Sequence, residues 1–560
     1  MITILGILLL LIPYILVFNA KHKLKTVLAV FTFTSLSYVC IAVLTQALHI
    51  FTYEVILTLH SFIALYSLYL YRKRKASHHE MVVDFPRGHV LPTLSNAVRN
   101  NIFPIFFLVL AFCLMYSVHF NYNGYVDSSV GLQTSTYSSY PYPLYSDEWA
   151  GASFVDYSIR TGQLPFANPL DRDVPFPNFL FITHSLIADI LLLLGLSVVT
   201  SYVYFAMLNA LVIVVALFLI LKIFKVRDSL ASITAFTALL LTNSGNLPGI
   251  WFLLPYAVSL TYLLYSIICL KLDSDQVHHE QSGHSLKHLP ILAVVNSGLS
   301  LFIYPPMIVF ILPVWLAYFG NKVTAFKKIY ITILACLALV IVFLTLFLIS
   351  GFQAGQTFAK AASYLVRNPL DIGIVYYWPW NVIPAFIIPF ICIGLYSIFK
   401  HNKKIILYPI IVGLAYWIFY TFNQMVYIIE PARVVVITSV FLMITAGLGF
   451  DTAYSFIKKK TKNTIIDVGD PFSRASLKVL VLFFFVFWVL NISKLGSWHK
   501  MPLIYDIKIP DLKGDMQYQH RKLTPAPPVT RYITKDDLSL FSGFEMKRFI
   551  SPSWKGLEIG

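Results

Sequence analysis

The sequence predicts an all-α polytopic membrane protein, a bundle of about 13–14 transmembrane helices with further helices in its extracytoplasmic loops. Three observations support this fold class. First, 12% of the residues are charged and 58% are hydrophobic, whereas a soluble domain carries about 25% charged residues. Second, the apolar residues gather into runs near the length that crosses a bilayer. Third, basic clusters separate these runs, as in loops that are retained on the cytoplasmic side.

The apolar runs predict fourteen spans. The first run has no preceding basic region and is followed by KHKLK, so it is predicted to be a retained span and not a cleaved signal peptide. The pair 289–303 and 305–319 is joined at Tyr-Pro-Pro and could equally form one broken helix. The predicted spans lie near residues 2–18, 26–44, 53–71, 101–119, 202–221, 229–243, 251–270, 289–303, 305–319, 329–350, 382–399, 405–421, 432–450 and 477–493.

The basic clusters fix the predicted orientation and the status of one further apolar run, 179–197. If every cluster is cytoplasmic, the fourteen spans alternate with both termini outside. Counting 179–197 as a span would turn four of the clusters outward, so we expect this helix to lie in, or dip into, the outer interface. Its polar residues His184, Ser185 and Asp189 fit that position better than a lipid-exposed span. The clusters occupy residues 21–25, 72–75, 222–227, 322–328, 400–404 and 458–462.

This topology divides the chain into four predicted parts. Residues 1–100 form N-terminal spans and a cytoplasmic loop, and 101–450 form a membrane module whose first outer loop is 120–201. Residues 451–493 form a cytoplasmic loop and the last span, and 494–560 form a short extracytoplasmic tail. No phosphate-binding glycine motif is present, which argues against a cytoplasmic nucleotide site. The five cysteines lie within apolar runs and indicate neither a disulfide framework nor a zinc site.

The first outer loop contains two adjacent acids, Asp147 and Glu148, in the sequence YSDEWAGASFVDYSIRTGQLP. Ser146 as N-cap and Gly162 at the end predict a short helix here. Acids stabilise the N-terminal end of a helix, and that alone would explain the pair. The same position can also keep a carboxylate ionised, so that it can accept a proton from an incoming hydroxyl. The residues leave open which of the two would be the base, and Asp147 is preferred.

Few basic residues are predicted outside. Arg433, in IIEPARVVVITS, lies near the outer mouth of a span that begins at Pro431. Glu430 could be a purely structural partner for it. Alternatively, the guanidinium could bind a lipid-linked phosphate, because its geometry matches phosphate bidentately. Arg367 and Arg160 are further phosphate-binding candidates. Aromatic residues of the outer segments are candidates for substrate contact, although rings gather at membrane interfaces for ordinary reasons: Tyr145, Trp149 and Trp378.

A long first outer loop with an acidic pair and aromatics, followed by a juxtamembrane helix ending LLLLGLS and a span ending in basic residues, resembles the polytopic GT-C glycosyltransferases. That superfamily includes protein O-mannosyltransferases, the lipid A aminoarabinose transferase, oligosaccharyltransferase catalytic subunits and cell-wall arabinosyltransferases. The resemblance covers roughly residues 101–450. In two respects the chain departs from the family: three spans precede the helix that enters the first loop, where one is usual, and the tail is shorter than the soluble domain of many members.

The resemblance implies a site on the extracytoplasmic face of a cell membrane, with the bacterial plasma membrane expected. Asp147 or Glu148 would be the catalytic base, or the ligand of a divalent cation such as Mg²⁺ or Mn²⁺. Arg433 would hold the phosphate of a polyprenyl-phosphate sugar donor. The acceptor would be an envelope glycan, lipid or protein, and no nucleic acid is expected.

Two alternatives remain at this stage. An envelope polysaccharide polymerase or ligase would use the same lipid substrates, but would rely on outer arginines and on His184 or His119. A transporter or flippase of lipid-linked substrates would have ionisable residues deep in its spans and inverted repeats. Glu54 and Asp451 lie close to predicted span ends and do not favour that class.

Overall fold

The structure is a computed structural model, and it describes sixteen stretches of the chain. They are residues 2–17, 23–77, 102–120, 125–128, 131–134, 146–168, 174–175, 178, 180–241, 250, 253–277, 288–320, 383, 387–401, 403–423 and 431–462.

The described chain is mainly helical, as predicted. The first helices are α1 (Ile2–Leu11), η1 (Ile12–Val17), α2 (Lys23–Ala47), α3 (Tyr53–Ser77) and α5 (Ile102–Phe120). The first outer loop holds β1 (Tyr125–Ser128), β2 (Gly131–Thr134), α6 (Ser146–Thr161), β3 (Ala167–Asn168), β4 (Val174–Pro175) and α7 (Phe181–Leu194). The rest comprises α8 (Val198–Ile223), α9 (Asp228–Thr237), η3 (Ala238–Leu240), α10 (Pro255–Val277), α11 (Leu289–Ile303), η4 (Pro305–Met307), α12 (Ile308–Phe319), α16 (Ile388–Lys400), α17 (Lys404–Asn423) and α18 (Pro431–Lys462).

Five of these helices are long and apolar enough to cross a membrane, which confirms the helical, multi-span fold class. They contain residues 24–47, 53–73, 201–223, 255–275 and 433–456, and seven shorter apolar helices accompany them. The structure separates 289–303 and 305–319 into α11 and α12, joined by the turn η4. The predicted spans 329–350 and 477–493 lie outside the described residues, so the total of 13–14 stays a prediction, as does the four-part division of the chain.

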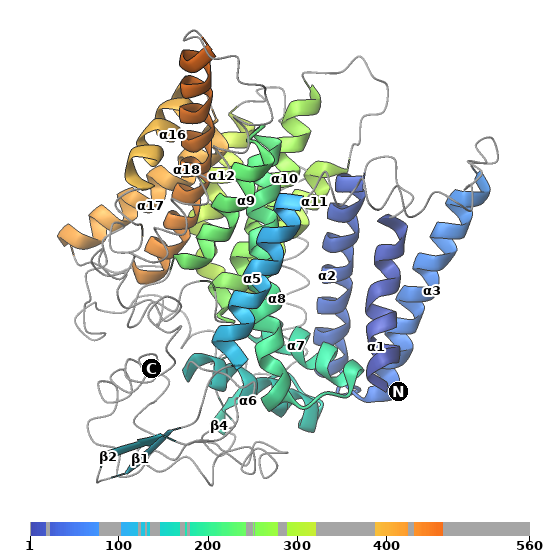
Figure 1. Cartoon of the computed structure of the whole chain (residues 1–560). Helices are drawn as coiled ribbons and strands as arrows, with labels where there is room; N and C mark the ends of the chain where they lie inside the picture. Colours follow the sequence, from blue (N-terminus) through green and yellow to red (C-terminus); the bar gives the residue numbers. More distant parts are fainter. Residues whose placement is uncertain are drawn as a thin grey trace.

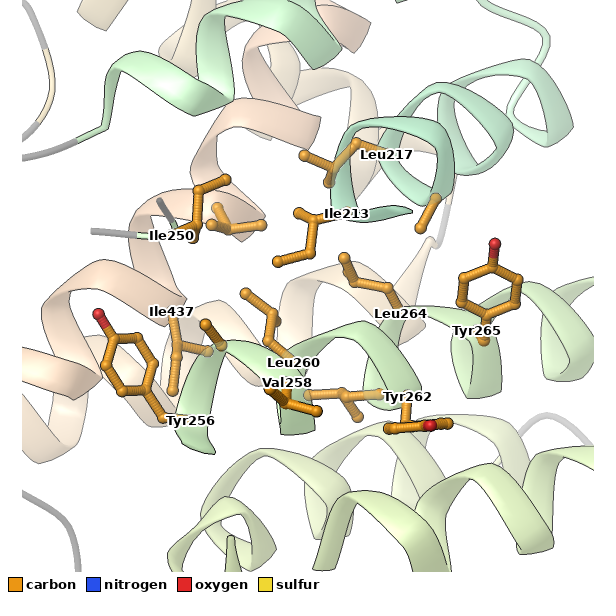
Figure 2. Packing of buried hydrophobic residues seen from close by; sticks show 14 of the residues in the cluster. Ile213, Leu217, Ile250, Tyr256, Val258, Leu260, Tyr262, Leu264, Tyr265 and Ile437 are labelled. Atoms are coloured by element: carbon orange, nitrogen blue, oxygen red, sulfur yellow. The ribbon is translucent and has the colours of Figure 1, made fainter. Parts of the chain in front are cut away.

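The helices differ in how deeply they lie in the protein. Most of α10 and α18 is buried, whereas little of α3, at the edge of the bundle, is buried. Figure 2 shows Leu260 and Leu264 of α10 packed beside Ile213 and Leu217 of α8. Between membrane helices such contacts stabilise the bundle through close van der Waals packing, because lipid tails are as apolar as these side chains. The centre of the bundle, and any site beside it, is therefore built around α10.

The two helices of the first outer loop lie together at one end of the bundle. Figure 1 shows α6 and α7 at the lower end, near the start of α1, and the C-terminal tip of α18 at the upper end. The helix predicted at 179–197 is observed as α7. Most of its residues are buried against neighbouring helices, and its predicted place at the outer membrane interface stays a prediction.

Candidate functional site

Helix α6 agrees with the prediction made from the acidic loop. It begins at Ser146 and ends at Thr161, with Gly162 closing it in the left-handed conformation (φ 66°). The Gly162 amide donates to the Ser158 carbonyl at 2.9 Å. Glycine adopts this backbone conformation without the steric cost of a side chain. The acidic pair therefore occupies the first turn of a helix, as expected.

Glu148 projects from that first turn into the bundle. Its side chain is fully buried, and its Oε1 accepts a hydrogen bond from the backbone amide of Leu253 at 2.8 Å. Leu253 stands two residues before α10 begins. The first amides of a helix have no partner within the helix, and the helix dipole favours negative charge there. Glu148 thus joins the loop helix α6 to the N-terminal end of α10. Asp147 lies beside it on α6, but its side chain is outside the described part of the structure.

Close packing behind α6 requires a glycine one turn after Glu148. A Cβ atom at Gly151 would collide with the Tyr202 hydroxyl of α8 and lie 3.3 Å from Nε2 of His184 on α7. Glycine at this position lets α6 approach both helices, and this contact fixes the depth at which Glu148 enters the bundle.

Arg433 approaches the start of α10 from the other side. It is the third residue of α18, and its guanidinium donates to the Tyr304 hydroxyl at 3.3 Å. The guanidinium also lies over the rings of Tyr256, at 5.8 Å, and Tyr304, at 5.7 Å. These two rings meet edge to face, with centroids 6.5 Å apart. Arginine over aromatic faces keeps its charge and is stabilised by the ring quadrupoles. Glu430, the structural partner considered from the sequence, lies outside the described residues.

Glu148 and Arg433 therefore converge on one short segment of the chain. Glu148 contacts Leu253, and Arg433 contacts Tyr256, three residues further along the start of α10. Figure 2 shows Tyr256 beside Ile437, which lies one helical turn after Arg433. An acid and an arginine that are far apart in sequence thus each contact the N-terminal end of α10.

The other predicted site residues either lie away from this contact region or are not described. Arg160 forms an ion pair with Asp156 on its own helix, at 2.6 Å, and its side chain is 40% exposed. Burial raises the pKa of Asp156, and the hydrogen bond from Arg160 opposes that rise. The side chain of Trp149, on α6, is not described. Three candidates lie entirely outside the described residues: Tyr145, Arg367 and Trp378.

The predicted divalent cation finds little support in the described residues. They contain no group of three or more metal-ligating side chains. Glu148 is the member of the acidic pair whose side chain is described, and one of its oxygens already accepts the Leu253 amide. Mg²⁺ is commonly held by one or two carboxylates together with waters, and the side chain of Asp147 is not described, so the divalent cation stays a prediction.

Sequence reasoning missed the partners of α7. Asn178 contacts His184 at 2.9 Å, Ser185 donates to Gln46 of α2 at 2.6 Å, and Asp189 pairs with His60 of α3 at 2.7 Å. The polar face of α7 therefore turns towards neighbouring protein. His60 lies inside an apolar span, and an ionisable residue in that position was the available signal.

The environment of His184 bears on the polymerase or ligase alternative. The imidazole is buried and stacks on Phe154 with ring centroids 5.3 Å apart. Burial lowers the pKa of His184 to about 3. A neutral imidazole of such low basicity is a poor proton acceptor at neutral pH, so the described geometry does not favour a histidine-based reaction at this position. The side chain of His119 is not described.

Comparison with known proteins gives a weak structural likeness. No protein-family model matches the sequence, and no curated protein matches it either. Among solved structures, the chain is similar to the archaeal oligosaccharyltransferase AglB from Archaeoglobus fulgidus, which was determined in complex with an inhibitory peptide and a dolichol-phosphate. The identity is 13%, the TM-score is 0.41, and the match covers 74% of this chain and 56% of AglB. This chain thus spans little more than half of AglB, and a likeness of this extent carries no functional argument.

Proposed function

We propose that this protein is a membrane glycosyltransferase that moves a sugar from a polyprenyl-phosphate donor to an envelope glycan, lipid or protein on the extracytoplasmic face. One observation carries the proposal: the buried Glu148 and the half-buried Arg433 both contact the N-terminal end of α10. This meeting point combines a carboxylate-bearing helix with a fixed guanidinium, the two kinds of group that glycosyl transfer from a phosphate requires. Arg367 and Arg160 are secondary candidates for the donor phosphate.

Arg433 is assigned the role of binding the phosphate of the sugar donor. A guanidinium can bind phosphate through two parallel hydrogen bonds, and its charge stabilises the negative charge that develops on the departing phosphate. The rings of Tyr256 and Tyr304 hold this group at the mouth of α18. A guanidinium that is already fixed in place does not have to reorganise as the reaction proceeds, and this is the source of its catalytic effect.

The two acids are assigned different roles. Glu148 is buried and already bonded to the backbone of α10, so it is the positioning residue that holds α6 in place. Asp147 occupies the preceding helical position, and successive helical side chains point about 100° apart. Asp147 is therefore proposed as the base.

The proposed reaction proceeds in one displacement at the anomeric carbon. The Asp147 carboxylate accepts the proton of the acceptor hydroxyl. The hydroxyl oxygen forms a bond to the anomeric carbon, while the bond from that carbon to the donor phosphate oxygen breaks. The polyprenyl phosphate leaves with the electron pair, beside Arg433. Tyr145, Trp149 and Trp378 are proposed to line the substrate path.

The test is sugar transfer by the purified, reconstituted protein with labelled polyprenyl-phosphate sugars. Asp147→Asn should reduce the transfer rate by about 10²–10⁴-fold, because a positioned base contributes that much. Arg433→Ala should reduce transfer and weaken donor binding. Glu54→Gln is a matched control, since Glu54 is an exposed acid at the start of α3. Normal transfer by both Asp147→Asn and Glu148→Gln would refute the scheme.

A further inference from the structure

Lysines from α10 and from the turn before α17 converge at the end of the bundle opposite α6. Phe224 directly follows α8 and is buried. The Lys271 ammonium of α10 lies 5.4 Å from the centroid of this ring, and the Lys403 ammonium, from the turn before α17, lies 5.3 Å from it. Two cations from distant parts of the sequence thus share one aromatic ring.

Further lysines extend this group, which we call the lysine cluster. Lys225 follows Phe224, is exposed and has a left-handed backbone (φ 65°). Lys400 ends α16 and lies over the ring of Tyr396. The lysine cluster consists of Lys225, Lys271, Lys400, Lys403 and Lys404.

The nearby acids do not balance these charges. Lys271 pairs with Asp275. Asp228 pairs with Lys222, and Asp451 pairs with Arg227 at 3.0 Å. Within the described ranges, the other four members of the lysine cluster form no ion pair with an acid. The surface therefore carries an excess of positive charge.

Neither the helix dipoles nor the membrane orientation of the chain accounts for this arrangement on its own. Lys403 and Lys404 stand at the N-terminal end of α17, where the helix dipole disfavours cations. Retention of basic loops in the cytoplasm explains why lysines are present, but not why they gather around one ring. Burial lowers the pKa of Lys403, and Lys271 lowers it further by repulsion, although Asp451 opposes the shift. A bound anion would relieve this repulsion.

The side chains around the cluster indicate what kind of anion fits. Tyr396 and Phe399, in the last turns of α16 beside Lys400, are 65% and 62% exposed. Exposed rings next to cations at the end of a membrane helix suit a ligand with a charged head and apolar tails. Basic pockets between helices on the cytoplasmic side bind anionic head groups in this way.

We propose that the lysine cluster binds the phosphate of an anionic lipid in the cytoplasmic leaflet. The lipid phosphate lies among Lys271, Lys403 and Lys404, and its acyl chains run along the exposed rings of α16. This site is separate from the proposed transferase site and does not depend on it.

Lipid binding by the full chain tests the proposal. The purified protein is titrated with phosphatidylglycerol or phosphatidylcholine in neutral detergent, and bound lipid is counted by native mass spectrometry. Wild type should bind phosphatidylglycerol preferentially. Each of Lys403→Gln and Lys271→Gln should weaken that binding about 5-fold, which is the equivalent of about 1 kcal/mol per basic residue at a charged membrane surface. Lys403→Arg should retain binding.

A control variant and a competitor distinguish a specific lipid site from general surface attraction and from a site for free phosphate. Lys73→Gln removes an exposed lysine from a different basic cluster, residues 72–75 at the end of α3, and should leave binding at the lysine cluster unchanged. An equal loss with Lys73→Gln would mean general surface attraction and would overturn the proposal. Inorganic phosphate at millimolar concentration should not displace the lipid. Tight binding of inorganic phosphate with no preference for phosphatidylglycerol would assign the site to free phosphate instead.

Discussion

Two buried acids, Glu148 and Asp189, stand on neighbouring helices of the same loop, and they are held in different ways. Both are fully buried. Glu148 accepts a backbone amide at the start of α10, whereas Asp189 pairs with the side chain of His60 on α3. A helix N-terminus supplies its dipole without a titrating partner, but a buried ion pair fails when one partner is removed. Glu148 thus connects α6 to the proposed site, and Asp189 connects α7 to α3.

Of the variants considered, removal of the His60 side chain should have the largest effect, and that effect should be a loss of stability. His60→Leu leaves Asp189 buried without its partner, so we expect a loss of about 3–5 kcal/mol in the free energy of unfolding. Thermal unfolding in detergent measures it. His60→Leu combined with Asp189→Leu removes the unpartnered carboxyl group and should recover most of the loss. A single variant as stable as wild type would show that this pair does not anchor α7.

Glu148→Gln should affect transfer instead. The amide weakens the bond to Leu253 and lets α6 shift, and a misplacement of about 1 Å can cost roughly 100-fold in rate. The transfer assay measures the rate, with unfolding monitored in parallel. Unlike Asp147→Asn, it should leave the pH profile of transfer unchanged in form, because Glu148 positions and does not titrate in the reaction. A stability loss that matches His60→Leu, with normal transfer, would remove the distinction between the two acids.

Gly151→Ala tests whether the depth of α6 matters. The added methyl group meets the Tyr202 hydroxyl, and overpacking of this kind typically costs about 1–3 kcal/mol. Thermal unfolding and transfer are measured on the same preparation. Tyr202→Phe removes the hydroxyl and should partly restore Gly151→Ala. Absence of any such rescue would argue that α6 contacts α8 elsewhere.

Arg160→Ala should have the smallest effect if its role is structural. The Arg160–Asp156 pair is partly exposed, and such pairs contribute about 0–1 kcal/mol. Stability should therefore change little. A large increase in the KM for the donor, at unchanged stability, would instead return Arg160 to the phosphate-binding set.

Local features of the site were predictable from the sequence, and its assembly was not. The start of α6, its glycine end and the entry of α18 at Pro431 follow from capping and turn rules that act over a few residues. The meeting of Glu148 with Leu253 joins residues 105 positions apart, and the His60–Asp189 pair joins residues 129 apart. No periodicity in a single sequence encodes such pairings. For that reason the interfacial placement of 179–197 overlooked the buried partners of its polar face.

Helix α18 also has a length that matches the thickness of a bilayer. Arg433 near one end and Asp451 towards the other are both ionisable, and the sequence between them is apolar. At 1.5 Å per residue their separation is about 27 Å, close to the ~30 Å hydrocarbon core of a typical bilayer. The apolar part of α18 is therefore long enough to cross the hydrocarbon core, with one ionisable residue near each side of the membrane.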